Sequence, residues 1–110
     1  AYRITTELRE LIEDCKCWIE FKTYEPDEIA ARFHHRLLYI HPFPNGNGRH
    51  ARLATDVLLN KQLQSKPFSW GRISIGKNID KKSDVRNEYI KALVSADKGD
   101  YQALLSFVRS

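Results

Sequence analysis

Residues 29–59 read IAARFHHRLLYIHPFPNGNGRHARLATDVLL, and this stretch decides the fold of the 110-residue chain. Apolar residues recur at three- and four-residue spacing from Ile29 to Ile40, which predicts an amphipathic helix. Two prolines and two glycines fall within positions 41–48, so this segment is predicted to be a loop. Residues 49–63 contain no helix breaker, and the helical pattern returns there with Leu53, Val57 and Leu58 as apolar positions beside Ala51 and Ala54. The stretch therefore predicts two helices joined by an eight-residue loop.

The rest of the chain is also predicted to be helical. Pro26 suits the first turn of the helix that precedes the loop, and Pro42 requires that this helix end before it. Gly99 and Asp100 are predicted to end one later helix and to cap the next. The remaining helices are predicted from these apolar positions: Ile4, Leu8, Leu11, Ile12, Cys15 and Ile19; Val85, Tyr89, Leu93 and Ala96; Leu104, Leu105 and Val108. We expect an all-α bundle of about five helices, with the loop between the second and third.

Composition sets the class of protein. Hydrophobic residues make up 42% and charged residues 29%, as in a soluble globular protein, and the length suits a single domain over residues 1–110. No apolar run is long enough to cross a membrane, and the sequence does not lead us to expect a secretory leader. Cys15 and Cys17 would point to nearly opposite faces of a helix, so we expect reduced cysteines and a cytoplasmic location.

The net charge of +4 favours an anionic partner. The basic residues are spread along the chain, without the charge run of a nucleic-acid tail, so a polynucleotide is the less favoured partner and a nucleotide satisfies the charge equally well. The four histidines, of which His34 and His35 are adjacent, lack the spacing of a metal site.

The loop and the helix after it combine features that suit phosphate chemistry. A helix N-terminus has unpaired N–H groups and a partial positive charge, and glycines let an anion approach the backbone closely. Arg49 and Arg52 share one face of that helix, and arginine is suited to forked contacts with phosphate oxygens. His41 stands just upstream and is able to accept a proton near neutral pH. Each feature alone is most often an ordinary turn, cap or solvated face, and only their coincidence favours phosphoryl or nucleotidyl transfer.

The segment HPFPNGNGRHAR, residues 41–52, resembles the signature His-x-Phe-x-Asp/Glu-Gly-Asn-Gly-Arg-x-x-Arg of the Fic (Fic/Doc) family. The surrounding sequence, from FHHRL at 33–37 to GDY at 99–101, resembles the Fic branch called mobile mystery protein B. That resemblance implies that the upstream part found in the branch is absent here. Fic proteins are all-α and mostly transfer AMP from ATP to a Ser, Thr or Tyr hydroxyl of a target protein; some relatives transfer phosphate, UMP or phosphocholine.

The resemblance implies a role for each matched position. His41 would be the general base, and Phe43 would anchor the loop in the core. Gly46, Asn47 and Gly48 would form the anion cradle, with the Asn47 amide reaching a phosphate. Arg49 would hold the outer phosphates, and Arg52 would meet the γ-phosphate or pair with an inhibitory glutamate.

The sequence departs from the family pattern at one fixed position of the signature. Asn45 replaces the Asp or Glu that holds Mg²⁺, and a neutral carboxamide is a poorer magnesium ligand. The family's inhibitory pattern, Ser/Thr-x-x-x-Glu-Gly/Asn, is also missing, because Leu11 follows the correctly spaced Thr6 and Glu10. An inhibitory, antitoxin-like partner is therefore one expectation. The hairpin flap that aligns the target in Fic enzymes would precede this chain.

These departures leave three functions open. The leading hypothesis is a Fic-type protein adenylyltransferase that uses ATP, with Mg²⁺ weakly expected. The second is a catalytically weak or inactive nucleotide-binding module, or a relative that transfers another group. The third is a basic nucleic-acid binder, which the charge alone supports.

Overall fold

The computed structural model describes residues 2–73 and 82–110, which divide into an N-terminal unit, residues 1–67, and a C-terminal unit, residues 68–110. Helices, and no strand, make up the regular secondary structure of the described residues, which confirms the all-α prediction. None of the described helices is long and apolar enough to cross a membrane. The expectation of a single domain over residues 1–110 stays a prediction.

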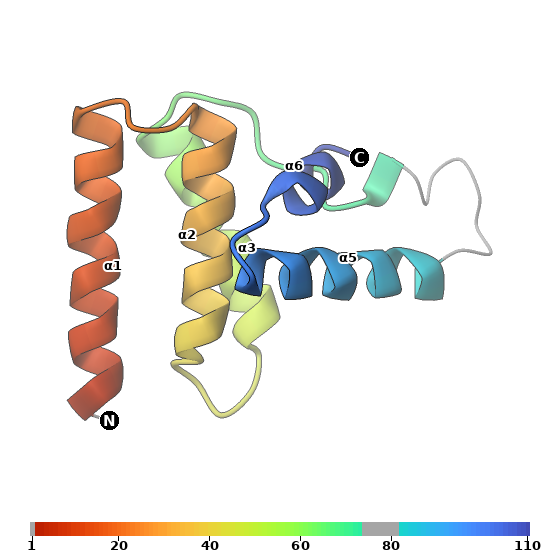
Figure 1. Ribbon diagram of the computed structural model, residues 1–110, viewed down its shortest axis with the longest axis horizontal. Helices are drawn as coiled ribbons and strands as arrows, with labels where there is room; N and C mark the ends of the chain where they lie inside the picture. Colours follow the sequence, from red (N-terminus) through yellow and green to blue (C-terminus); the bar gives the residue numbers. More distant parts are fainter. Residues whose placement is uncertain (1, 74–81) are drawn as a thin grey trace. The chain divides into compact units, whose positions relative to one another are not determined.

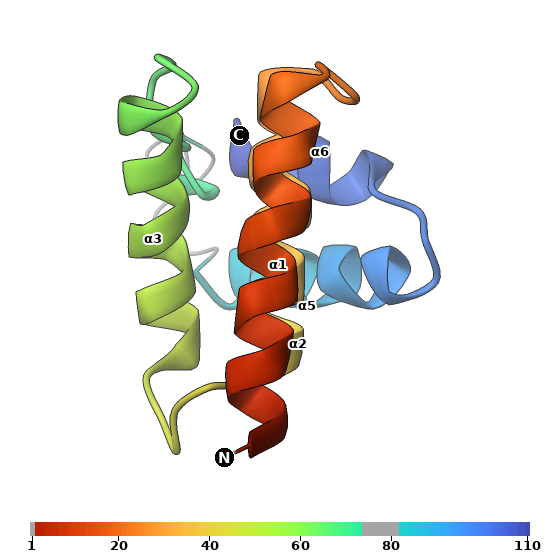
Figure 2. The same ribbon diagram turned by 90° about the vertical axis from the view of Figure 1, so that its left-hand side faces the viewer.

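The N-terminal unit consists of three helices, α1 (Tyr2–Glu20), α2 (Pro26–Ile40) and α3 (Asn47–Lys61). Helices α1 and α2 pack against each other, side by side in Figure 1 and with α1 in front of α2 in Figure 2. The loop after α2 is at the opposite end of the unit from the α1–α2 turn (Figure 1). Helix α2 begins at the predicted proline and ends before Pro42, as the sequence indicates.

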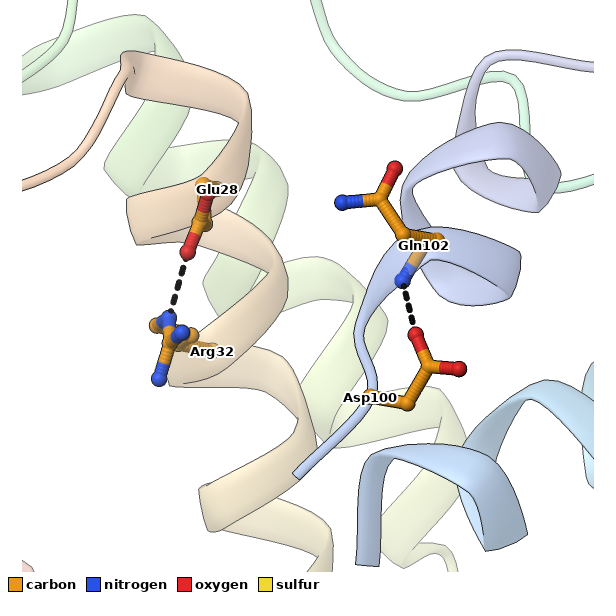
Figure 3. A network of polar contacts seen from close by, with 4 residues as sticks. All are labelled: Glu28, Arg32, Asp100 and Gln102. Atoms are coloured by element: carbon orange, nitrogen blue, oxygen red, sulfur yellow. Dashed lines mark hydrogen bonds and ion pairs between the residues drawn. The ribbon is translucent and has the colours of Figure 1, made fainter. Parts of the chain in front are cut away.

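Helix α2 packs against both α1 and α3 and therefore buries residues on more than one face. Leu11 of α1, Leu37 and Ile40 of α2, and Ala51 of α3 form a buried apolar cluster. An ion pair joins α1 to α2, since Arg36 Nη1 lies 2.5 Å from Asp14 Oδ2. On α2 itself, Arg32 Nε donates to Glu28 Oε2 at 2.8 Å and supports the first turns (Figure 3).

Helix α3 differs from its prediction in two respects. It begins at Asn47, two residues early, because Gly46 takes a left-handed conformation with φ 76° and caps the helix. Its buried residues are Asn47, Ala51, Thr55 and Leu59, at four-residue spacing, whereas the apolar Leu53 and Val57 are exposed. Small side chains on this face allow α3 to approach α2 closely, and packing overrides the hydrophobic pattern.

Helix α1 places the two cysteines in different surroundings, as their spacing predicts, and corrects one apolar position. Cys15 is buried, Cys17 is exposed, and both are free thiols. Burial raises the pKa of the Cys15 thiol to about 11. Ile12, predicted to lie on the apolar face, is half exposed.

The C-terminal unit contains α5 (Lys82–Asp97) and α6 (Gln102–Val108). Gly99, with φ 90°, ends the turn after α5 by donating its N–H to the Ala96 carbonyl at 2.9 Å. Asp100 Oδ1 accepts the N–H of Gln102, the first residue of α6, at 3.1 Å (Figure 3). The predicted end at Gly99 is therefore confirmed. The N-cap of α6 is Tyr101, one residue after the predicted Asp100, and Asp100 supports the helix start from the preceding position. Gly71, with φ 80°, packs so tightly that an added Cβ would lie 2.6 Å from Val85.

Candidate functional site

The residues that match the family signature lie at one end of the N-terminal unit, between the last residue of α2 and the first turns of α3 (Figure 1). The loop itself spans residues 41–46. Because the two helices are packed against each other, the loop holds its two ends close together. Residues 41–52 are thereby gathered around the N-terminus of α3.

His41 caps the C-terminal end of α2 in a left-handed conformation, with φ 54° and ψ 61°. Its backbone N–H donates to the Leu37 carbonyl at 3.3 Å, and the following proline prevents the helix from continuing. A non-glycine residue in this conformation costs roughly 1–2 kcal/mol. The turn directs the exposed imidazole toward the start of α3, where its Nε2 lies 3.3 Å from Asn47 Nδ2.

Asn47 connects the loop to α3. Its Oδ1 accepts the backbone N–H of Phe43 at 3.0 Å, and its Nδ2 donates to the Phe43 carbonyl at 2.7 Å. The side chain is 8% exposed, so these bonds are partly shielded from water. The resemblance implies an amide that reaches a phosphate; here that amide pairs with the loop backbone.

The expectation that Phe43 anchors the loop in the core is wrong. Its side chain is 44% exposed, and its ring packs edge-on against His50 with centroids 4.8 Å apart. Phe43 is instead tied to α3, by its ring through His50 and by its backbone through Asn47. The loop is therefore fixed to the first turn of the helix that it precedes.

The start of α3 is suited to bind an anion. Gly46 has no atom within 4 Å of an added Cβ, so its backbone is open to a ligand. At Gly48, an added Cβ would lie 3.2 Å from Arg52 Nη1, which places that guanidinium over the first turn. Arg49 is exposed and makes no ion pair within the described ranges. Two guanidinium groups and the positive end of a helix dipole thus accompany the cradle.

Asn45 is exposed on the loop and offers one neutral carbonyl oxygen to a cation. No group of three or more His, Cys, Asp or Glu side chains in the described part of the chain is placed to hold a metal ion. Magnesium prefers several hard, charged oxygen ligands. The donor set therefore does not hold Mg²⁺ by itself.

His34 also lies near α3, but it is fully buried between helices. Its Nδ1 is 3.4 Å from Thr55 Oγ1, and it hydrogen-bonds the Ala51 backbone. The pKa of His34 is lowered from 6.5 to about 4, mainly by burial. The hydrogen bond to Ala51 opposes this shift, and the nearby positive charges of Arg52 and His35 contribute to it. His34 is accordingly neutral at pH 7.

Sequence reasoning missed two of these contacts. An asparagine at a helix start usually signals a cap, so nothing in the pattern indicated that the Asn47 side chain hydrogen-bonds the backbone N–H and C=O of Phe43. Nothing indicated which of the adjacent His34 and His35 is buried. The four-residue spacing of Asn47, Ala51 and Thr55 was the available signal, but their mixed polarity concealed it.

Comparison with known proteins agrees with this arrangement. The family model described as "Fic/DOC family" matches residues 1–59, which include α1, α2, the loop and most of α3. No solved structure matches the chain significantly. The finer likeness to the mobile mystery protein B branch stays a prediction.

Similar curated proteins carry the name "Protein adenylyltransferase Fic". The protein of Nematostella vectensis is 36% identical over 76% of this chain, and that of Aedes aegypti is 29% identical over 93%. "Protein adenylyltransferase fic-1" of Caenorhabditis elegans is 31% identical over 90%. The chain spans 17–19% of the length of these relatives. On the family match and the arrangement of residues 41–52, the chain belongs to the Fic/DOC family.

Proposed function

We propose that the chain carries the catalytic centre of a protein adenylyltransferase, which moves AMP from ATP to a Ser, Thr or Tyr hydroxyl of a target protein. The observation that carries this proposal is the position of His41, whose Nε2 lies beside the open first turn of α3. A base next to a phosphate cradle is the minimum that nucleotidyl transfer to a hydroxyl requires. The names of the similar proteins support the same activity.

The chemical step assigned to this site balances with ATP and one hydroxyl. The hydroxyl oxygen attacks the α-phosphorus of ATP while His41 Nε2 takes its proton. The bond from the α-phosphorus to the bridging oxygen breaks, and pyrophosphate leaves. The target keeps AMP as a phosphodiester, and the imidazolium returns its proton to solvent or to pyrophosphate.

Arg49, Arg52 and the backbone from Gly46 to Gly48 are assigned to the triphosphate. The unpaired N–H groups of a first helical turn bind phosphate oxygens, and the exposed Arg49 is free to reach the outer phosphates. Arg52, which extends over Gly48, adds a second positive charge. Charge build-up on the leaving pyrophosphate is stabilised by these groups.

Because Asn45 replaces a carboxylate, the proposal must also say how Mg²⁺ would reach the site. Since the described donor set does not hold Mg²⁺ alone, we expect any magnesium to arrive on the ATP phosphates and Asn45 to contact it weakly. The Asn45→Asp variant should therefore increase activity at low Mg²⁺ more than at saturating Mg²⁺. Equal activity of both proteins across the titration would remove Asn45 from the metal site.

The test of the proposed function uses ATP labelled on either the α- or the γ-phosphate. The chain is incubated with each nucleotide, Mg²⁺ and peptides that contain Ser, Thr or Tyr, and modified products are weighed by mass spectrometry. Transfer of the α-label, with the mass of AMP, supports the proposal. Transfer of the γ-label alone would assign phosphate transfer instead.

The second candidate is a nucleotide-binding module with little or no transfer, which the neutral side chain of Asn45 favours. In that case calorimetry detects ATP binding while neither label is transferred. Asn45→Asp then separates the two causes, because restored transfer would identify a defect in the metal ligand alone. An antitoxin-like inhibitory partner is a further proposal, tested by adding a co-encoded protein to an active preparation.

A further inference from the structure

The side chain of Asn47 is oriented by its two hydrogen bonds to the backbone N–H and C=O of one residue, Phe43. The N–H of Phe43 can only donate, so the atom 3.0 Å from it must be the carboxamide oxygen. The carbonyl of Phe43 can only accept, so the atom 2.7 Å from it must be the carboxamide nitrogen. The reversed amide would bring donor against donor and acceptor against acceptor. The positions of Oδ1 and Nδ2 are thus fixed by chemistry.

This orientation determines what His41 can present to Asn47. The Nδ2 group carries two hydrogens, of which one is used by the Phe43 carbonyl. The other faces His41 Nε2 across 3.3 Å, at the long end for a hydrogen bond. Because Nδ2 only donates, Nε2 must offer a lone pair. The ring is then neutral with its proton on Nδ1.

We infer that Asn47 is a positioning residue, which holds His41 in the Nδ1-protonated tautomer before the target binds. The target hydroxyl then takes the place of the Asn47 N–H at Nε2, whose freed lone pair accepts the target proton. A neutral histidine in water prefers the opposite tautomer, with the proton on Nε2. The preference is small, and one oriented donor is enough to reverse it. The left-handed backbone of His41 and the pairing of Asn47 with Phe43 fix both partners of this contact.

The inference gives Asn47 a different role from that of a phosphate ligand. Both hydrogens of its carboxamide are used within the protein, by the Phe43 carbonyl and by His41. A phosphate oxygen accepts but cannot donate, so it has no hydrogen of this side chain to bind as long as Asn47 keeps its contact with His41. The backbone N–H of Asn47 remains available to the anion cradle.

The first test measures the tautomer without relying on activity. The 110-residue chain is labelled with ¹⁵N-histidine, and two-bond ¹⁵N–¹H correlations are recorded at about pH 8, above the ordinary range of histidine. His41→Gln identifies the His41 signals among those of the four histidines. We expect a protonated Nδ1 and an unprotonated Nε2 in the unsubstituted chain. A protonated Nε2 would overturn the inference.

The second test exchanges the donor for an acceptor of the same shape. In Asn47→Asp, a carboxylate faces His41, and we expect the proton to move to Nε2. Asn60→Ala is the matched control, because Asn60 lies exposed on the same helix, and it should leave the tautomer unchanged. An unchanged His41 spectrum in a folded Asn47→Asp protein would contradict the inference. If that variant does not fold, the tautomer of His41 measured in the unsubstituted chain still tests the inference.

The third test rests on the proposed function and separates positioning from phosphate binding. Loss of base alignment should lower kcat of Asn47→Ala by about 10- to 100-fold and leave the KM for ATP nearly unchanged. A raised KM with an unchanged kcat would return Asn47 to the role of phosphate ligand. Absence of transfer by the unsubstituted chain would count against the proposed function, whereas the tautomer would still be measured.

Discussion

His34 lies within α2, His41 directly follows the last residue of α2, and the two side chains have opposite surroundings. His34 is sealed in the interior of the N-terminal unit, whereas His41 is exposed at the end of α2. Both meet one face of α3, on which the buried residues recur at four-residue spacing. Thr55 and Ala51 contact His34, and Asn47 contacts His41. Burial makes one imidazole a structural group, and position at a helix end makes the other available for chemistry.

The largest expected effect separates the two histidines by activity. His41→Ala should lower AMP transfer by about 10²- to 10⁴-fold, because the base is lost, while ATP binding is retained. Transfer is measured with α-labelled ATP and binding by calorimetry. Asn60→Ala is the control, since Asn60 is exposed on α3 and is no part of the loop. Undiminished transfer by the His41→Ala protein would show that His41 is not the general base.

The free energy of unfolding should depend on His34 more than on His41, which is the reverse of the expected effect on activity. His34→Ala leaves a cavity and removes the partner of Thr55, so we expect a loss of about 2–4 kcal/mol in the free energy of unfolding. His41→Ala should change it by less than about 1 kcal/mol.

Urea unfolding gives this comparison if fluorescence reports only the N-terminal unit. The chain has two tryptophans, of which Trp18 lies in that unit and Trp70 in the other. Trp70→Phe is therefore the background for all variants. Equal losses for His34→Ala and His41→Ala would break the distinction between a structural and a chemical histidine.

The low pKa of His34 predicts acid sensitivity. The unfolded chain binds a proton below pH 6.5, whereas the folded chain binds it only near pH 4, so the unfolded state takes up more protons between these values. The contribution of neutral His34 to the free energy of unfolding is fully present above pH 6.5. It is lost as the pH falls toward 4, by up to about 3 kcal/mol.

The pH series is best run as a difference between proteins. His34→Gln should lack the part of the slope that His34 causes, and His50→Gln should keep it. Urea midpoints at several pH values between 4 and 7 give the two slopes. A His34→Gln protein with the unsubstituted slope would assign the acid sensitivity to other groups.

The smallest effect concerns the hydroxyl that accompanies His34. Thr55 Oγ1 donates to the Ala51 carbonyl at 2.7 Å and lies beside His34 Nδ1. Thr55→Val keeps the shape and removes the hydroxyl, so we expect a loss of about 1 kcal/mol in the free energy of unfolding. Thr23→Val, at an exposed position, serves as the control. A gain in stability would mean that the hydroxyl is more costly to bury than to omit.

Much of the fold was readable from the sequence. Proline positions set both ends of α2, the spacing of apolar residues indicated α1, and Gly99 and Asp100 marked the boundary between α5 and α6. Such local signals act within a few residues, where backbone geometry alone restricts the chain. Predictions of burial were weaker, since Ile12, Leu53 and Val57 are exposed despite their apolar character.

The site divides in the same way. The sequence by itself determined that His41, the glycines and the two arginines cluster around one helix start, because they are close along the chain and motif chemistry is local. Only the tertiary structure decided that His34 is buried, that Phe43 stays at the surface, and that Asn47 hydrogen-bonds the Phe43 backbone beside His41. These outcomes depend on how closely α2 and α3 approach, which packing between helices sets.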